Sequence, residues 1–279
     1  MTTAPVQTVR DAPPERDAVL VPVARVGYAA RGVSYALVGA LAVAAAVTAG
    51  REDAPDLKSA SRWLLDQPFG AAIVIAIAVG LAAFGTWQLV RGVEDADHDG
   101  SDGKALFKRA GFILSGMIQF AIAWGIFRLA RGAAGAGGEQ SAQDRTAALM
   151  AYPLGRWLVA AIGIGIVAYA VSQFVRAYRT DLDDQLDLSR VGATARRWIR
   201  TISRFGMAAR GVVFTLTGLF LILAAWRSDA SEARGLGGAL EALERQPYGP
   251  WLMGTVALGL VAYGMYLFVL SRYRRIRTD

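Results

Sequence analysis

Six long apolar stretches, each of about 20 residues, constrain this chain more than any other feature. They cover residues 26–49, 71–90, 110–130, 157–175, 205–226 and 251–270. None of the six contains Asp or Glu. A stretch of this length crosses a bilayer as a helix, because only a helix pairs its own backbone polar groups where water is missing. The sequence therefore predicts an all-α, polytopic membrane protein with six transmembrane helices.

The chain also contains the same pattern three times, in repeat 1 (25–93), repeat 2 (109–180) and repeat 3 (204–279). Each repeat opens with Arg-x-Gly-x-x-x-Arg/Ser-Gly, and the key positions are Arg25 and Arg31, Arg109 and Ser115, and Arg204 and Arg210. Each second span follows a Pro-x-Gly turn and contains Gly-x-x-Ala-Phe/Tyr. Three parallel helical-hairpin repeats are expected, and pseudo-threefold packing is one arrangement they allow.

The segments outside the repeats are polar. We expect a disordered cytoplasmic tail over 1–24, which lacks the apolar core of a signal peptide. Residues 94–108 form an acidic, Gly-containing loop, and residues 181–203 a linker with a basic amphipathic segment. A short amphipathic stretch precedes each Pro-x-Gly turn, and we expect it to form a helix on the outer surface or to cap the bundle.

The distribution of Lys and Arg predicts the orientation. The N-terminal flank, the segments 91–109 and 176–204 and the C-terminal tail carry 18 Lys and Arg, against 10 on the other side, with Arg31 and Arg210 within the spans set aside. By the positive-inside rule, both termini are cytoplasmic and the protein is expected in the bacterial plasma membrane. The net charge of +7 is then explained by anionic lipid, and no nucleic-acid partner is expected.

The residues that carry most enzyme chemistry are scarce. The chain has no Cys and a single His, His98, which lies in an acidic loop without the spacing of a calcium site. We therefore expect no catalytic residues, no metal site and no cofactor, and predict that the protein is not an enzyme.

Charged residues within spans are the main candidates for a binding site. Arg31 and Arg210 lie about one and a half turns inside their spans, each six residues after Arg25 and Arg204; repeat 2 retains only Arg109 of its pair. These five arginines are predicted to contact anionic lipid headgroups or an anionic solute. The alternative is that Arg31 and Arg210 extend to the membrane interface without binding anything.

Three glutamines within the spans are the second set of candidates. Gln88 and Gln173 occupy equivalent positions near the ends of their spans, and Gln119 lies near the middle of another. We predict polar contacts between helices for them; a polar path through the bundle is the other interpretation.

The repeated starts, the Gln-Pro-Phe/Tyr-Gly turns and the Gly-Leu-x-Ala-Tyr/Phe-Gly pattern resemble a bacterial membrane family, domain of unknown function 1206. Repeat 2 departs from the pattern, with Ser115 for the second Arg and Tyr152 for the Gln. The resemblance implies tandem two-helix units in a membrane and supplies no catalytic residues.

These observations favour a scaffold, a lipid-associating protein or a subunit of a membrane assembly. Anionic membrane lipids are the expected partners, together with a membrane-protein partner or a second copy of the chain. The alternative is a transporter or channel for a small solute. Against it stand the absence of an acidic residue in the spans and the absence of inverted repeats.

Overall fold

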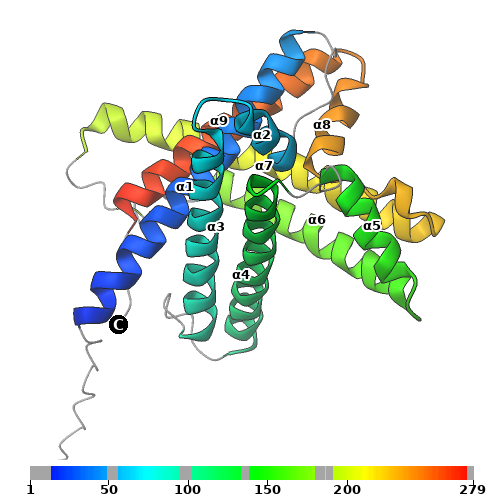
Figure 1. Cartoon of the computed structure of the whole chain (residues 1–279), viewed down its shortest axis with the longest axis horizontal. Coiled ribbons are helices and arrows are strands. Elements are labelled where there is room, and N and C mark those ends of the chain that lie inside the picture. Colours follow the sequence, from blue (N-terminus) through cyan, green and yellow to red (C-terminus); the bar gives the residue numbers. More distant parts are fainter. Residues whose placement is uncertain are drawn as a thin grey trace, which may run out of the picture.

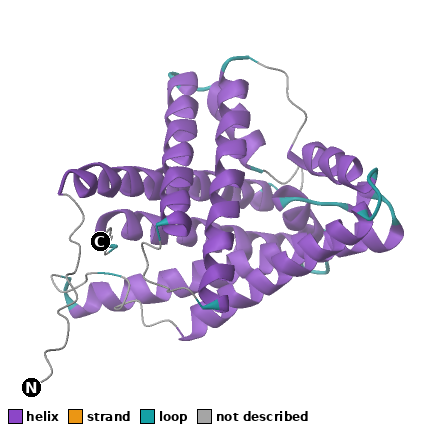
Figure 2. Ribbon diagram, turned by 90° about the horizontal axis from the view of Figure 1, so that it is seen from below, coloured by secondary structure: helices purple, strands orange, loops and turns teal. Residues whose placement is uncertain are grey.

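The computed structural model describes residues 14–48, 56–94, 102–132, 138–179, 186 and 191–274. Six helices have the length and apolar composition to cross a membrane: α1 (Pro14–Val47), α3 (Gly70–Val93), α4 (Gly103–Ala130), α6 (Gly155–Arg179), α7 (Ala193–Arg227) and α9 (Gly249–Tyr273). The described residues contain no strand, only an isolated bridge between Leu186 and Arg274 (Figure 2). The predicted fold class, an all-α multi-pass membrane protein, is confirmed.

The long helices pair between repeats. The second long helix of each repeat packs on the first long helix of the next: α3 on α4, α6 on α7, and α9 back on α1. In Figure 1 these three pairs run in three different directions and cross near the middle of the molecule. Together with the packing of α1 on α3 and of α7 on α9, these contacts link the six long helices in a ring that stays open between the described residues of α4 and α6. The structure therefore does not show the full pseudo-threefold packing that the sequence allowed.

Small residues allow the paired helices to approach each other closely at these interfaces. A Cβ on Gly32 of α1 would lie 3.0 Å from the carbonyl oxygen of Gly264 on α9 and 3.3 Å from the ring of Phe268. In the equivalent interface, a Cβ on Gly211 of α7 would lie 2.9 Å from the ring of Phe174 on α6. Glycine lets two helix backbones approach where any side chain would separate them.

Three short helices lie where the sequence predicts them, before the Pro-x-Gly turns: α2 (Leu57–Leu65), α5 (Gly138–Met150) and α8 (Leu236–Glu244). Together with the short 3₁₀ helix η2 (Ala230–Glu232) they gather in one part of the molecule (Figure 1), and α5 contacts both α2 and α8. The Lys58 Nζ donates to the Ser141 Oγ at 3.1 Å, and the Gln143 Nε2 donates to the Ser231 carbonyl at 3.2 Å. These contacts join the three repeats at the end that carries the turns.

Three long helices begin before the apolar stretches, and the expectation of disorder over 1–24 is wrong for residues 14–24. Residues 14–24 belong to α1, residues 103–108 to α4 and residues 193–203 to α7. Helices α1 and α7 begin at positions related by the same offset of 179 residues that relates repeats 1 and 3, so the repeat is longer than its motif. Residues 1–13 and His98 lie outside the described residues.

A candidate anion-binding site at the centre of the ring

Arg210 is the most deeply buried charged side chain that the structure describes in the spans, with 4% of its surface exposed. Its Nε donates to the Tyr35 hydroxyl at 3.1 Å, and its Nη1 donates to the Tyr263 hydroxyl at 2.8 Å. Tyr35 comes from α1 and Tyr263 from α9. The guanidinium therefore points into the bundle, which rules out for Arg210 the interpretation that it extends to the interface.

Four aromatic rings surround this guanidinium. Its Cζ lies 4.8 Å from the ring centroids of Phe214 and Tyr263, 5.2 Å from that of Tyr169 and 5.6 Å from that of Tyr35. Tyr169 belongs to α6, so repeats 1, 2 and 3 each contribute a ring. The site thus lies where the three repeats meet.

Arg31 adds a second positive charge beside one of these four rings, that of Tyr35. Its Cζ lies 4.5 Å from the Phe84 ring centroid and 5.8 Å from that of Tyr35. The Tyr35 and Tyr263 rings pack edge to face at 4.8 Å. The two arginines, from equivalent positions of repeats 1 and 3, thus share Tyr35. We call Arg31, Arg210 and their rings Tyr35, Phe84, Tyr169, Phe214 and Tyr263 the central arginine cluster.

The central arginine cluster has excess positive charge. The six spans contain no Asp or Glu. Hydrogen bonds to a charged group contribute about 1.5–3 kcal/mol each and cation–π contacts up to about 2 kcal/mol. Together these are comparable to the several kcal/mol that burying one ion costs. The tyrosines can therefore hold Arg210 in place, but they do not neutralise it.

The chemistry that would complete such a site is an oxyanion. Arg210 has five N–H donors, of which two bond to tyrosine hydroxyls. The planar fork of a guanidinium matches the oxygens of a phosphate or carboxylate. At an effective dielectric constant of about 20, a negative charge about 4 Å away gains about 4 kcal/mol from each guanidinium.

Repeat 2 has a polar contact in place of the arginine. Ser115 of α4 accepts a hydrogen bond from the Gln88 Nε2 of α3 at 3.3 Å, and the Gln88 Oε1 accepts from the Arg91 Nη1 at 2.9 Å. Gln173 is buried at the position of α6 equivalent to Gln88, and Gln119 is buried at the position equivalent to Tyr35 and Phe214. For Gln88 the structure thus supports the interhelical interpretation over a polar path.

The other three candidate arginines lie apart from the cluster. Arg25 and Arg204 are exposed, about 9 Å along their helix axes from Arg31 and Arg210. Arg109 donates from its Nε to the Gly92 carbonyl at 2.8 Å and from its Nη2 to the Val93 carbonyl at 2.7 Å. This contact satisfies carbonyl groups at the end of α3 and ties α4 to it.

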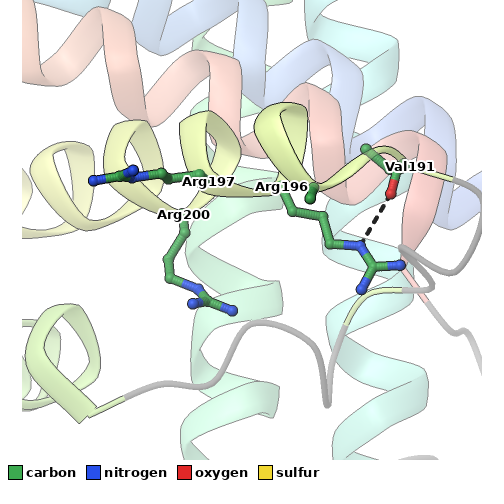
Figure 3. Close-up of a pocket in the computed structure, with 5 residues that line it drawn as sticks. Val191, Arg196, Arg197 and Arg200 are labelled. Atoms are coloured by element: carbon green, nitrogen blue, oxygen red, sulfur yellow. Dashed lines mark hydrogen bonds between the residues drawn. The ribbon is translucent and has the colours of Figure 1, made fainter.

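A shallow hollow lies at the start of α7, lined by Val191, Ala193, Arg196, Arg197 and Arg200. Figure 3 shows the three arginine side chains pointing in different directions, with the Arg196 Nε donating to the Val191 carbonyl at 3.1 Å. This is the basic segment expected from the sequence. Its side chains do not converge on one point, unlike those of the central arginine cluster.

Sequence reasoning did not select the aromatic members of the cluster. Phe84, Tyr169 and Tyr263 are the last residues of the repeated Gly-x-x-Ala-Phe/Tyr pattern. An aromatic residue recurring at one position of three spans was the available signal. Tyr35, by contrast, has no tyrosine at its equivalent positions, so no repeat marks it.

The fold and the central arginine cluster define a class: a multi-pass membrane protein of three two-helix repeats around a shared, positively charged centre. The chain belongs to the family described as Domain of Unknown Function (DUF1206), which matches residues 26–95, 110–180 and 205–274. It is also similar to the "Uncharacterized protein YxxB" of Bacillus subtilis (strain 168), with 32% identity over 252 residues that cover 90% of each chain. No solved structure matches it.

Proposed function

We propose that this chain is a non-enzymatic integral protein of the bacterial plasma membrane that binds a phosphate-bearing anionic ligand at the central arginine cluster. The bound group is the headgroup of an anionic phospholipid. The observation that carries the proposal is Arg210, which is buried beside a second arginine in a bundle whose spans contain no carboxylate. A buried charge is usually paired, and here the pairing group is absent from the spans themselves.

A lipid-binding role fits a scaffold or a subunit of a membrane assembly. The cluster draws a ring or a guanidinium from every repeat, so an anion bound there would hold the three repeats together. The excess of Lys and Arg in the loops and tails on the side of the termini favours a cytoplasmic location for both termini. The cluster would then lie toward the inner leaflet, where anionic lipids concentrate.

The test is the thermal stability of the purified protein in mild detergent. Adding phosphatidylglycerol should raise the Tm of the wild type, whereas phosphatidylcholine should not, because a ligand that binds only the folded state stabilises it. Saturation at about 100 times Kd corresponds to about 2.7 kcal/mol. A parallel titration with inorganic phosphate separates a lipid headgroup from a free anion.

Two double variants are compared. The test variant combines Arg31→Gln with Arg210→Gln, and the control combines Arg25→Gln with Arg204→Gln. Each pair removes two charges from α1 and α7, but only the first lies in the cluster. The first pair should lose the response to phosphatidylglycerol and the second should retain it. Equal responses of both pairs would refute the proposal, and a response to phosphate alone would assign the site to a soluble anion.

A further inference from the structure

The three interfaces between repeats share one contact, so equivalent positions can be compared across them. In each interface a glycine on the first long helix of one repeat lies against a side chain on the second long helix of another. The pairs are Gly116 with Leu89, Gly211 with Phe174 and Gly32 with Phe268, which are equivalent in the repeats. A Cβ on the glycine would lie 2.9 Å, 2.9 Å and 3.3 Å from the respective side chain. The helices thus meet in the same register in all three interfaces.

The residues directly before this contact also face each other. In the α3–α4 interface they are Gln88 and Ser115, and the Gln88 Nε2 donates to the Ser115 Oγ at 3.3 Å. In the α6–α7 interface the equivalent residues are Gln173 and Arg210. The shared register therefore places the Gln173 side chain opposite Arg210 of the central arginine cluster.

The neighbours of Gln173 on α6 support this placement. Tyr169, one turn earlier, has its ring centroid 5.2 Å from the Arg210 Cζ and packs edge to face on Phe214 at 5.5 Å. Phe174, the next residue, lies against Gly211, which follows Arg210. Gln173 lies between these two contacts, and only 3% of its surface is exposed.

The amide of Gln173 forms no hydrogen bond with any residue that the structure describes. Gln88, in contrast, bonds to both Ser115 and Arg91. A buried polar group without a partner is costly, and such groups normally have one. A guanidinium has only donors, and the Nε2 of glutamine has two. An anion with several oxygens would satisfy Gln173 and Arg210 together.

One interface of the three combines an amide with an arginine. Gln88 stands opposite Ser115, which carries no charge, and Leu267 is the equivalent residue opposite Arg31. Leucine has no polar atom to offer a ligand. The combination of a positive charge with a neutral donor is therefore specific to the α6–α7 interface, beside Arg210.

We propose that Gln173 belongs to the anion-binding site and donates from its Nε2 to an oxygen of the phosphate group that Arg210 binds. This inference rests on the proposed function and adds a residue that sets the preference for the ligand. A guanidinium attracts any anion, whereas the amide stabilises only an anion with a second oxygen directed at α6. The phosphodiester of a phospholipid has two unesterified oxygens and meets this requirement.

The first experiment measures how much phosphatidylglycerol gives half of the maximal Tm shift of the full-length protein in mild detergent. Gln173→Leu introduces the residue that repeat 3 has at this position, Leu267. The half-maximal concentration should rise about tenfold or more, since a hydrogen bond to a charged group is lost. Gln88→Leu is the matched control. It should lower the Tm without ligand, because the bond to Ser115 is lost, but leave the half-maximal concentration unchanged.

The second experiment replaces the amide with a carboxylate. Gln173→Glu would place a negative charge opposite Arg210 and pair with it, so the ligand is no longer needed. The Tm without ligand should therefore rise above that of the wild type, and the response to phosphatidylglycerol should disappear. Gln88→Glu adds the same charge opposite Ser115 and should retain the response.

Two results would overturn the role of Gln173. They are an unchanged half-maximal concentration in Gln173→Leu, and a ligand-free Tm of Gln173→Glu below that of the wild type, loss of folding included. The proposed function would survive either result if the variant with Arg31→Gln and Arg210→Gln still lost its response. A wild type that does not respond to phosphatidylglycerol would refute both. Should Gln173→Leu not fold, Gln173→Glu decides.

Discussion

The carbonyl oxygen of Gly85 on α3 lies 2.9 Å from where Gly116 on α4 would carry a Cβ. The same relationship joins Gly264 of α9 to Gly32 of α1, at the equivalent positions of the ring. Two interfaces between different repeats are thus each built on a pair of glycines, and the two pairs occupy equivalent positions. The contact explains why a chain rich in small residues forms a specific bundle, since these faces admit only a bare backbone.

Replacing a glycine in this contact should therefore destabilise the protein. Gly116→Val adds atoms that the carbonyl of Gly85 cannot accommodate, and overpacking of this kind costs about 1–3 kcal/mol. Gly111→Val, one turn and a half earlier on the same helix, meets open space. Thermal unfolding in detergent should give a clearly lower Tm for Gly116→Val and an unchanged or higher one for Gly111→Val. Similar values for both would mean that the α3–α4 contact is not specific.

The helices themselves could be predicted from the sequence, because an apolar run of about 20 residues and a repeated motif can each be recognised within one segment of the chain. The pairing of the helices could not be predicted in this way. Each span carries small residues on several faces, so nothing local indicates that Gly85 meets Gly116 in the next repeat. Arg210 is a similar case. Its spacing from Arg204 predicts how deep the residue lies along its helix, but the inward direction of its side chain depends on Tyr35, which lies 175 residues away in the chain.

The hydroxyl of Tyr263 should contribute to stability through Arg210. Tyr263→Phe keeps the ring and removes the oxygen that accepts from the Arg210 Nη1 at 2.8 Å. A lost hydrogen bond to a buried charged group costs about 1.5–3 kcal/mol. Tyr248→Phe is the control, because Tyr248 is exposed on the turn that precedes α9. The Tm should fall in Tyr263→Phe and not in Tyr248→Phe; equal Tm values would show that the hydroxyl does not hold Arg210.

The Pro-x-Gly turns should not tolerate a side chain at their glycine. The preceding residues Phe69, Leu154 and Tyr248 adopt left-handed backbone conformations with φ of 61°, 65° and 62°. A Cβ on Gly249 would lie 1.5 Å from the Glu244 carbonyl oxygen, because the chain reverses directly over the end of α8. Gly249→Ala is therefore expected to reduce the yield of folded protein or its Tm. Gly103→Ala at the start of α4, where space is open, should change neither.

Tyr248 itself should be a site where stability can be gained. A bulky residue held at positive φ costs about 1–3 kcal/mol, and glycine adopts the same conformation freely. Because the Tyr248 side chain is exposed, Tyr248→Gly loses little packing within the chain. The Tm in detergent should rise or stay constant, whereas Tyr248→Val, whose branched Cβ resists positive φ, should lower it. A lower Tm for the glycine variant would show that the ring makes a stabilising contact worth more than the backbone strain.

The orientation proposed from the loop charges can be tested with single cysteines, since the chain has none of its own. Thr194 at the start of α7 and Ser231 in η2 are both exposed, so a cysteine at either position is accessible once reagent reaches its side. In intact cells, a membrane-impermeant maleimide should modify Ser231→Cys and leave Thr194→Cys unmodified until the cells are opened. The reason is the excess of Lys and Arg on the side of Thr194, which the positive-inside rule keeps in the cytoplasm. The opposite pattern would invert the topology and move the central arginine cluster toward the outer leaflet, away from most anionic lipid.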